Sequence, residues 1–186
     1  MPYALFLAAV LFSVDPASSA RGASADSVRR LAPSAFPTLP ASIRRDLELR
    51  GCLVPQPWDG RTAQNVIRGA FSAANADEWA VLCSIREESQ ILIYRSPPTG
   101  AALVIDSLQR SPDREWLQGI GGGRWGYSRL IRLRTRRQIR GWHVSVDGKP
   151  IPQPIDHDAI EQLFEDKGAE AFYFARGVWY RRLTAD

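Results

Sequence analysis

The sequence predicts an α+β fold, with a single, mostly antiparallel sheet of about six to eight strands. An N-terminal helix and a later amphipathic helix are expected to pack against this sheet. Three observations lead to the prediction. Short apolar segments separated by polar turns are typical of strands. Two other segments space their apolar residues as helices do. The 186 residues suffice for one domain with its own core, and no internal repeat is visible.

The first twenty residues are predicted to be a signal peptide. The apolar run at 4–12 is too short to span a bilayer as a helix. It is followed by small residues, of which Ser18 and Ala20 suit a signal peptidase site. The alternative is a buried N-terminal helix, and cleavage after Ala25 is equally compatible with the sequence.

The expected domain organisation follows from this leader. Residues 21–38 show little periodicity and are predicted to form a flexible leader, and residues 39–186 the single α+β domain. We expect an exported protein, periplasmic or extracellular, with no transmembrane segment after cleavage.

The chain contains two cysteines, Cys52 and Cys83. In an exported protein such a pair predicts one disulfide bond. The alternative is two buried free thiols, which would fit a protein that is not exported.

The segment "LPASIRRDLELRG" at 39–51 is predicted to be the N-terminal helix. Pro40 suits the first turn, Ile43 and Leu47 share a face, and Gly51 suits the residue after the helix.

A run of four strands should follow as an antiparallel meander, at 64–71, 78–85, 90–96 and 102–108. Residues Trp79, Val81, Cys83 and Ile85 alternate onto one face of the second strand. A disulfide to Cys52 would therefore place the end of the first helix over that face. The run "ILIY" at 91–94 is apolar on both faces, which predicts a central strand.

The later elements are expected in the following order. A short helix at 111–119, with Ser111 as N-cap, precedes a glycine loop. Strands are expected at 129–135 and 139–146, then a proline-rich loop at 146–154. An amphipathic helix at 155–168 would begin at Asp156 as N-cap, and a hairpin around Gly177 would close the chain.

The loop after the short helix contains a literal G-x-G-x-x-G, formed by Gly121, Gly123 and Gly126. A dinucleotide site needs a strand before these glycines and a helix after them. Here the expected order is reversed, so we exclude a nucleotide fingerprint and expect no cofactor.

Two interpretations of this loop remain open. The glycines either serve the path of the chain alone or form a ligand-binding loop with their aromatic and basic neighbours. Such a loop would suit a glycan, a cell-envelope component or a protein partner. The candidate binding residues are Trp116, Gly121, Gly122, Gly123, Arg124, Trp125, Tyr127 and Arg129.

A basic run lies beside this loop. Arg132, Arg134 and Arg136 alternate along the predicted strand and should share one face. They could bind an anion, but the acidic residues of 156–170 offer internal neutralisation, which we favour. Nucleic acid is a poor candidate partner because no recognition motif accompanies the charge.

The sequence contains no convincing catalytic constellation, so we expect a binding module rather than an enzyme. A small extracytoplasmic hydrolase acting through Asp113, His143 or His157, with Ser128 as a nucleophile, is the alternative. A structural or inhibitor-type partner protein is a third possibility. The three adjacent residues at 156–158 converge poorly on one ion, so no metal site is expected.

The motifs "RGC", "NVIRGAF", "EWAVLCS" and "SPDREWLQGIGGG" occur between residues 50 and 123. With these motifs the sequence resembles a group of exported bacterial proteins of unknown function, over most of residues 36–183. The resemblance implies export, and it implies no activity, cofactor or catalytic residue.

Overall fold

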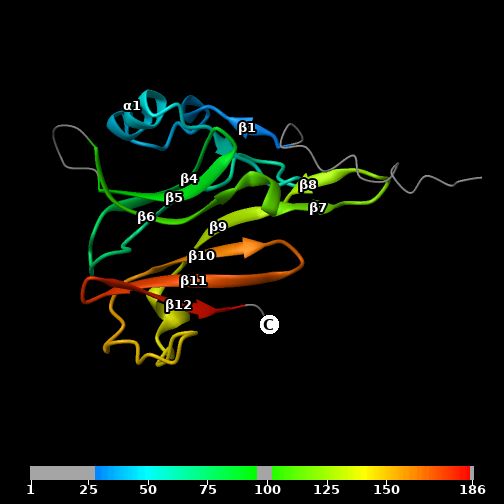
Figure 1. Ribbon diagram of the computed structural model, residues 1–186. Helices are drawn as coiled ribbons and strands as arrows, with labels where there is room; N and C mark the ends of the chain where they lie inside the picture. Colours follow the sequence, from blue (N-terminus) through cyan, green and yellow to red (C-terminus); the bar gives the residue numbers. More distant parts are fainter. Residues whose placement is uncertain (1–27, 96–101, 185–186) are drawn as a thin grey trace, which may run out of the picture.

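The computed structural model describes residues 28–95 and 102–184 of the chain. Within these residues the protein is mostly β, with twelve strands in four separate sheets and two short α-helices. Figure 1 shows two four-stranded sheets stacked between α1 and the loop that contains α2. The expectation of a single sheet in an α+β fold is therefore wrong.

All strand pairs of the described residues are antiparallel. The first large sheet has the order β3 (Val66–Gly69), β4 (Glu78–Ile85), β5 (Glu88–Arg95), β6 (Leu103–Pro112). The second has the order β12 (Val178–Leu183), β11 (Gly168–Ala175), β10 (Ala159–Phe164), β9 (Arg129–Arg134). The two small sheets pair β1 (Arg30–Leu31) with β2 (Val54–Pro55), and β7 (Leu117–Gly119) with β8 (Trp125–Tyr127).

The helices are short. The two α-helices are α1 (Ala41–Leu49) and α2 (Arg136–Ile139). Two single-turn 3₁₀ helices, η3 (Pro33–Ala35) and η4 (Asp113–Trp116), connect neighbouring elements. No helix in the described ranges has the length and hydropathy needed to cross a bilayer.

The two large sheets enclose the main hydrophobic core. Leu82 and Ile93 of the first sheet pack with Ile131, Ile160 and Phe172 of the second. The sheets are joined where β3 begins, because the buried Asn65 side chain bonds both to the Arg129 carbonyl oxygen (3.1 Å) and to the Ile131 amide (2.8 Å). This side-chain bridge fixes β9, and the hairpin before it, against the first sheet.

The opposite face of the first sheet is covered by α1, as predicted. Ile43 and Leu47 of α1 pack in one cluster with Cys52, Cys83 and Trp79. The Cys52–Cys83 disulfide is present and joins the end of this helix to β4. The prediction that β5 is central is also confirmed, because β5 lies between β4 and β6 and is buried on both faces.

The predicted helix at 155–168 is wrong, because residues 159–164 form β10. Ala159, Ile160, Leu163 and Phe164 have helical spacing, but the residues between them are not exposed. Glu161 and Gln162 are both buried by partners on β9. A strand that is buried on both faces loses the alternation by which a strand is usually recognised.

Two further local predictions are wrong. The strand expected at 139–146 is replaced by α2 and a loop, because Thr135 and Gln138 form a capping box that starts a helical turn. The helix expected at 111–119 is reduced to η4, while Ser111 belongs to β6 and residues 117–119 to β7.

The flexible leader predicted at 21–38 contains secondary structure in the part that the structure describes. The predicted signal peptide at 1–20 lies outside the described residues, but residues 28–38 contain β1 and η3, and Val28 and Phe36 are buried. The hairpin around Gly177 is present as predicted, formed by β11 and β12.

Candidate functional site

The glycine loop is the turn of the β7–β8 hairpin, which extends away from the two large sheets (Figure 1). The backbone angle φ is +86° at Gly121, +59° at Gly122 and +72° at Gly123. Three successive left-handed residues make glycine necessary here. The turn is closed by hydrogen bonds between the backbones of Ile120 and Arg124 (3.0 Å) and of Arg124 and Gly121 (3.1 Å). The glycines thus serve the path of the chain, and they also expose its tip.

Two tryptophans flank this tip. Trp125 is 46% exposed, and Trp58, from the loop after β2, is 45% exposed. Trp58 lies directly on Gly126, where a Cβ atom would stand only 2.5 Å from the Trp58 Cβ. Because successive side chains of a strand point to opposite faces, Trp58 and Trp125 lie on opposite faces of the hairpin.

We call the tip of the hairpin, together with its two flanking tryptophans, the hairpin surface. Its residues are Trp58, Ile120, Gly121, Gly122, Gly123, Arg124 and Trp125. Arg124 is exposed and makes no ion pair within the described residues. Trp58 was not predicted, since it lies far from the loop in sequence and its contact with Gly126 arises only in the fold.

The remaining candidates do not belong to this surface. Tyr127 is 1% exposed, and its hydroxyl lies 3.2 Å from the Ser89 Oγ. Arg129 is fully buried, with its guanidinium 4.5 Å from the ring centre of the half-buried Trp116. The sequence grouped eight residues, but the structure divides them between an exposed tip and a buried cluster.

Arg129 is an unusual buried cation. Its guanidinium donates to the Gln162 Oε1 (2.6 and 2.9 Å), the Ser89 carbonyl (2.9 Å) and Oγ (2.8 Å), and the Gln109 carbonyl (2.5 Å). None of these acceptors is a carboxylate. Burial lowers the pKa of this guanidinium below its usual value. The arrangement stabilises the junction of β6, β9 and β10 and offers nothing to a ligand directly.

Internal neutralisation explains most of the remaining basic run, as we favoured. Arg132 and Arg134 both pair with the buried Glu161 on the neighbouring strand β10. The acidic partner stands on a strand and not on a helix. Arg136 belongs to α2 rather than to the same strand face.

The residues of the hydrolase alternative do not converge. The buried Asp113 carboxylate accepts from Arg30 (2.7 Å) and from the Ser84 Oγ (2.6 Å). His157 lies on the outer side of the second sheet, between Asp156 and the Phe174 carbonyl oxygen.

The two other members of that alternative add no catalytic pair. His143 is exposed in the loop after α2. The buried Ser128 Oγ has no hydrogen-bond partner within the described residues. No group of three or more metal-ligating side chains occurs in the described ranges.

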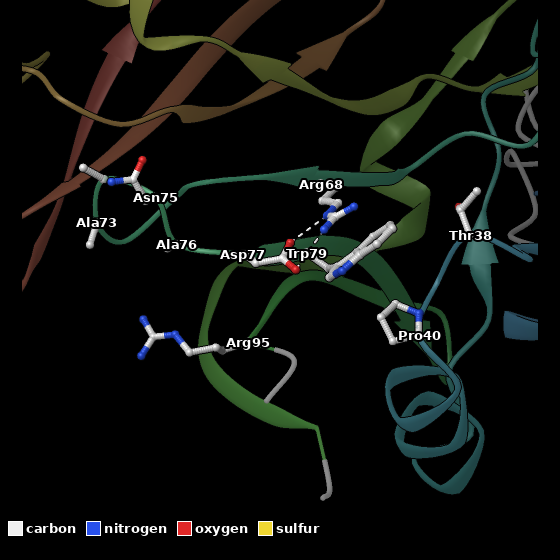
Figure 2. Close-up of a pocket in the computed structure, with 10 residues that line it drawn as sticks. Thr38, Pro40, Arg68, Ala73, Asn75, Ala76, Asp77, Trp79 and Arg95 are labelled. Carbon is white, nitrogen blue, oxygen red and sulfur yellow. Dashed lines mark hydrogen bonds and ion pairs between the residues drawn. The ribbon is translucent and has the colours of Figure 1, made fainter. Parts of the chain in front are cut away.

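A groove of about 980 Å³ lies beside the β3–β4 connection (Figure 2). One of the residues that line it is Arg68, which makes two hydrogen bonds to Asp77 (2.6 and 2.9 Å) and lies next to Trp79. Arg95, at the other side, pairs with the buried Glu78 (2.9 Å). Because both guanidiniums already have carboxylate partners, this groove is a weaker candidate than the hairpin surface.

A pair of carboxyl groups lies at the base of the hairpin. Asp59 follows Trp58, whose amide bonds to the Tyr127 carbonyl oxygen (2.8 Å), and the Glu165 amide bonds to the next carbonyl, of Ser128 (3.1 Å). Burial, together with the nearby charge of Asp59, raises the pKa of Glu165 to about 7.

This carboxyl pair predicts a pH-dependent stability. Because the folded-state pKa of Glu165 lies above its ordinary value of 4.5, the folded chain holds the proton more tightly than the unfolded chain. The resulting stabilisation is complete below pH 4.5 and is lost as pH rises through about 7. Chemical unfolding across this range should show a smaller decrease in unfolding free energy for Glu165→Gln than for the wild type.

Two further variants test whether the neighbouring charge of Asp59 causes the decrease. Asp59→Asn removes the neighbouring charge and should also reduce the decrease. Glu48→Gln changes an exposed carboxyl of α1 and should leave the decrease intact. An unchanged pH profile in Glu165→Gln would show that the Glu165 carboxyl does not cause the decrease.

Comparison with protein-family models, curated proteins and solved structures found no match. The fold itself defines the class as a mostly β protein of two facing four-stranded sheets with a projecting hairpin. The disulfide is compatible with an exported protein.

Proposed function

We propose that this protein is an exported interaction module that docks through its hairpin surface into a cleft of a partner protein. The observation that supports this most is the exposure of Trp58 and Trp125 on opposite faces of one projecting hairpin. Tryptophan and arginine are the residues most enriched among those that dominate protein interfaces.

The two-sided arrangement favours a cleft over a flat ligand. A flat polymer can contact one face of the hairpin, which leaves the other tryptophan in water. A cleft encloses both faces and removes both indole rings from water. Arg124 at the tip would then meet an acceptor on the partner, and the Gly122 and Gly123 amides, which have no backbone acceptor in the described chain, could donate as well.

The hairpin is built for such a role because it is held rigidly. Trp58 is fixed by the hydrogen bond that its amide donates to the Tyr127 carbonyl oxygen and by its contact with Gly126. Tyr127 and Leu117 anchor the base of the hairpin in the main core. A preorganised contact surface loses little conformational freedom when it binds.

Site-specific photo-crosslinking tests the proposal. A photoreactive residue at Arg124 should form defined adducts with proteins of the native cell envelope, identified by mass spectrometry. Excess wild-type protein should compete, and Trp58→Ala or Trp125→Ala should compete at least about tenfold less well. The control position is Leu49, which is highly exposed at the end of α1.

Two outcomes would contradict the proposal. The photoreactive residue at Leu49 could form the same adducts as the one at Arg124, or both tryptophan variants could compete as well as the wild type. Either result would show that the hairpin surface does not contact the partner protein. Binding to purified glycans that depends on the same tryptophans would replace the partner protein with a carbohydrate.

A further inference from the structure

A separate cavity lies at one end of the space between the two large sheets. It measures about 240 Å³, opens to solvent, and is lined by residues of η4, β10, β11 and β12. The lining residues are Trp116, Gln162, Phe164, Gly168, Ala169, Glu170 and Leu183. We call this space the Trp116 cavity, and it is distinct from the hairpin surface.

The cavity has firmly placed aromatic walls. The ring centres of Trp116 and Phe164 are 5.4 Å apart, and the Trp116 Nε1 donates to the Ser111 Oγ (2.7 Å). Arg129 lies against Trp116 (4.5 Å), and the Lys167 Nζ lies 4.3 Å from the ring centre of Phe164. The Trp116 ring is therefore held in place by its hydrogen bond to Ser111 and by its contacts with Arg129 and Phe164.

Gly168 leaves the cavity open. It pairs with Phe164 across β10 and β11, and a Cβ atom built on it would meet nothing within 4 Å. Its backbone does not lie in the left-handed region. A larger side chain would therefore fit at this position and would fill the cavity rather than strain the strand.

One polar group of the cavity, the Glu170 carboxylate, can accept a further hydrogen bond. Both ends of the Gln162 amide are engaged, by Arg129 and by Glu170. The Glu170 carboxylate accepts from Gln162 (3.0 Å) and makes only a long ion pair with Arg181 (3.4 Å). A carboxylate can accept about four hydrogen bonds, so Glu170 can take a further donor.

The surrounding charges determine the ligand class. An anion in this cavity would lie in direct contact with the Glu170 carboxylate. A cation would face three nearby cations, Arg129, Lys167 and Arg181, against that one carboxylate, so a neutral ligand with a hydrogen-bond donor fits best. Drug-sized ligands need cavities of roughly 300–1,000 Å³, so this one suits a single small ring system. We infer that the Trp116 cavity binds a neutral aromatic compound with one hydrogen-bond donor, of the indole or phenol class, with the donor on Glu170.

Protein-observed NMR with indole as the probe tests this inference. Saturable shifts are expected for the Trp116 indole N–H and for the amides of Gly168 and Glu170. N-methylindole lacks the donor and should bind about tenfold or more weakly, because a hydrogen bond to a charged acceptor is lost. Benzoate and benzylamine should each bind more weakly than indole.

The matched variants are Gly168→Leu and Gly141→Leu. Gly168→Leu should abolish the shifts, whereas Gly141→Leu, also built into open space but in the loop after α2, should retain them. Trp125→Ala should bind indole as wild type does, which separates this cavity from the hairpin surface. Absence of saturable binding, retained binding in Gly168→Leu, equal binding of N-methylindole, or tighter binding of either charged probe would each overturn the inference.

Discussion

Reduction of the Cys52–Cys83 disulfide is expected to lower the free energy of unfolding by about 3–4 kcal/mol. The bond closes a loop with a sequence separation of 31 residues. Opening that loop gives the unfolded chain more conformations, which shifts the equilibrium toward unfolding. Domains of this size are typically stable by only about 5–15 kcal/mol, so the expected loss is a large fraction of the total.

Equilibrium unfolding in urea, with and without reductant, measures this effect. The double variant Cys52→Ala/Cys83→Ala should lose somewhat more than the reduced wild type. Both cysteines are buried against α1, and truncation to alanine also removes packing there. In the double variant, added reductant should have no further effect.

A loss below about 1 kcal/mol on reduction would contradict the prediction. It would mean that the contacts of α1 with β4 hold residues 52–83 together even in the unfolded ensemble. The urea dependence of the unfolding free energy would then be nearly the same for both redox forms, because the unfolded chains would expose similar surface.

The first half of the fold could be predicted because its signals are local. Trp79, Val81 and Cys83 alternate with residues of the opposite face, and residues 91–94 are apolar throughout. The disulfide then determined where α1 must lie. Each of these inferences needed only a short segment and one pairing of cysteines.

In the second half, the strand at 129–134 and the hairpin around Gly177 were predicted. Its other elements could not be predicted, because their signals depend on contacts between distant residues. From the sequence alone, Glu161 fits the polar face of a helix. Only the fold shows that Arg132 and Arg134 of β9 pair with it and bury it in a strand. Likewise, nothing near Arg129 in the sequence shows that it is buried beneath Trp116. A charged side chain is expected at the surface unless its partners are known.

The candidate site was likewise predicted only where its residues are close together in the sequence. Arg124 and Trp125 were named as candidates because they follow three adjacent glycines, which require a turn, but the sequence left their exposure open. Trp58 was missed, because its place on Gly126 follows from the fold and not from spacing. Its local signal was weak, a single tryptophan in the segment "PWDG".

Arg129→Met is expected to destabilise the protein by about 3–5 kcal/mol, although methionine fills a similar volume, because three acceptors lose their donor. Replacing a buried ionic group with an apolar one can be neutral when its partners are replaced too. Here the carbonyl oxygens of Ser89 and Gln109 and the Gln162 Oε1 remain, and their donor is lost. Buried acceptors without donors each cost about 1–3 kcal/mol.

Three comparisons make this prediction specific. Arg124→Met removes an exposed arginine from the same region and should change the unfolding free energy by less than about 0.5 kcal/mol. Arg129→Lys keeps the charge but not the planar fork of donors, so it should remain clearly destabilising. Gln162→Leu combined with Arg129→Met removes one orphaned acceptor and should recover part of the loss.

The recovery in this double variant distinguishes two roles for Arg129. If the guanidinium stabilises the fold through its hydrogen bonds, the two substitutions are coupled and their effects do not add. If Arg129→Met proves neutral or stabilising on its own, the hydrogen bonds contribute nothing beyond packing. The buried charge would then have to be explained by its place against Trp116, at the wall of the cavity that we propose binds a neutral aromatic donor.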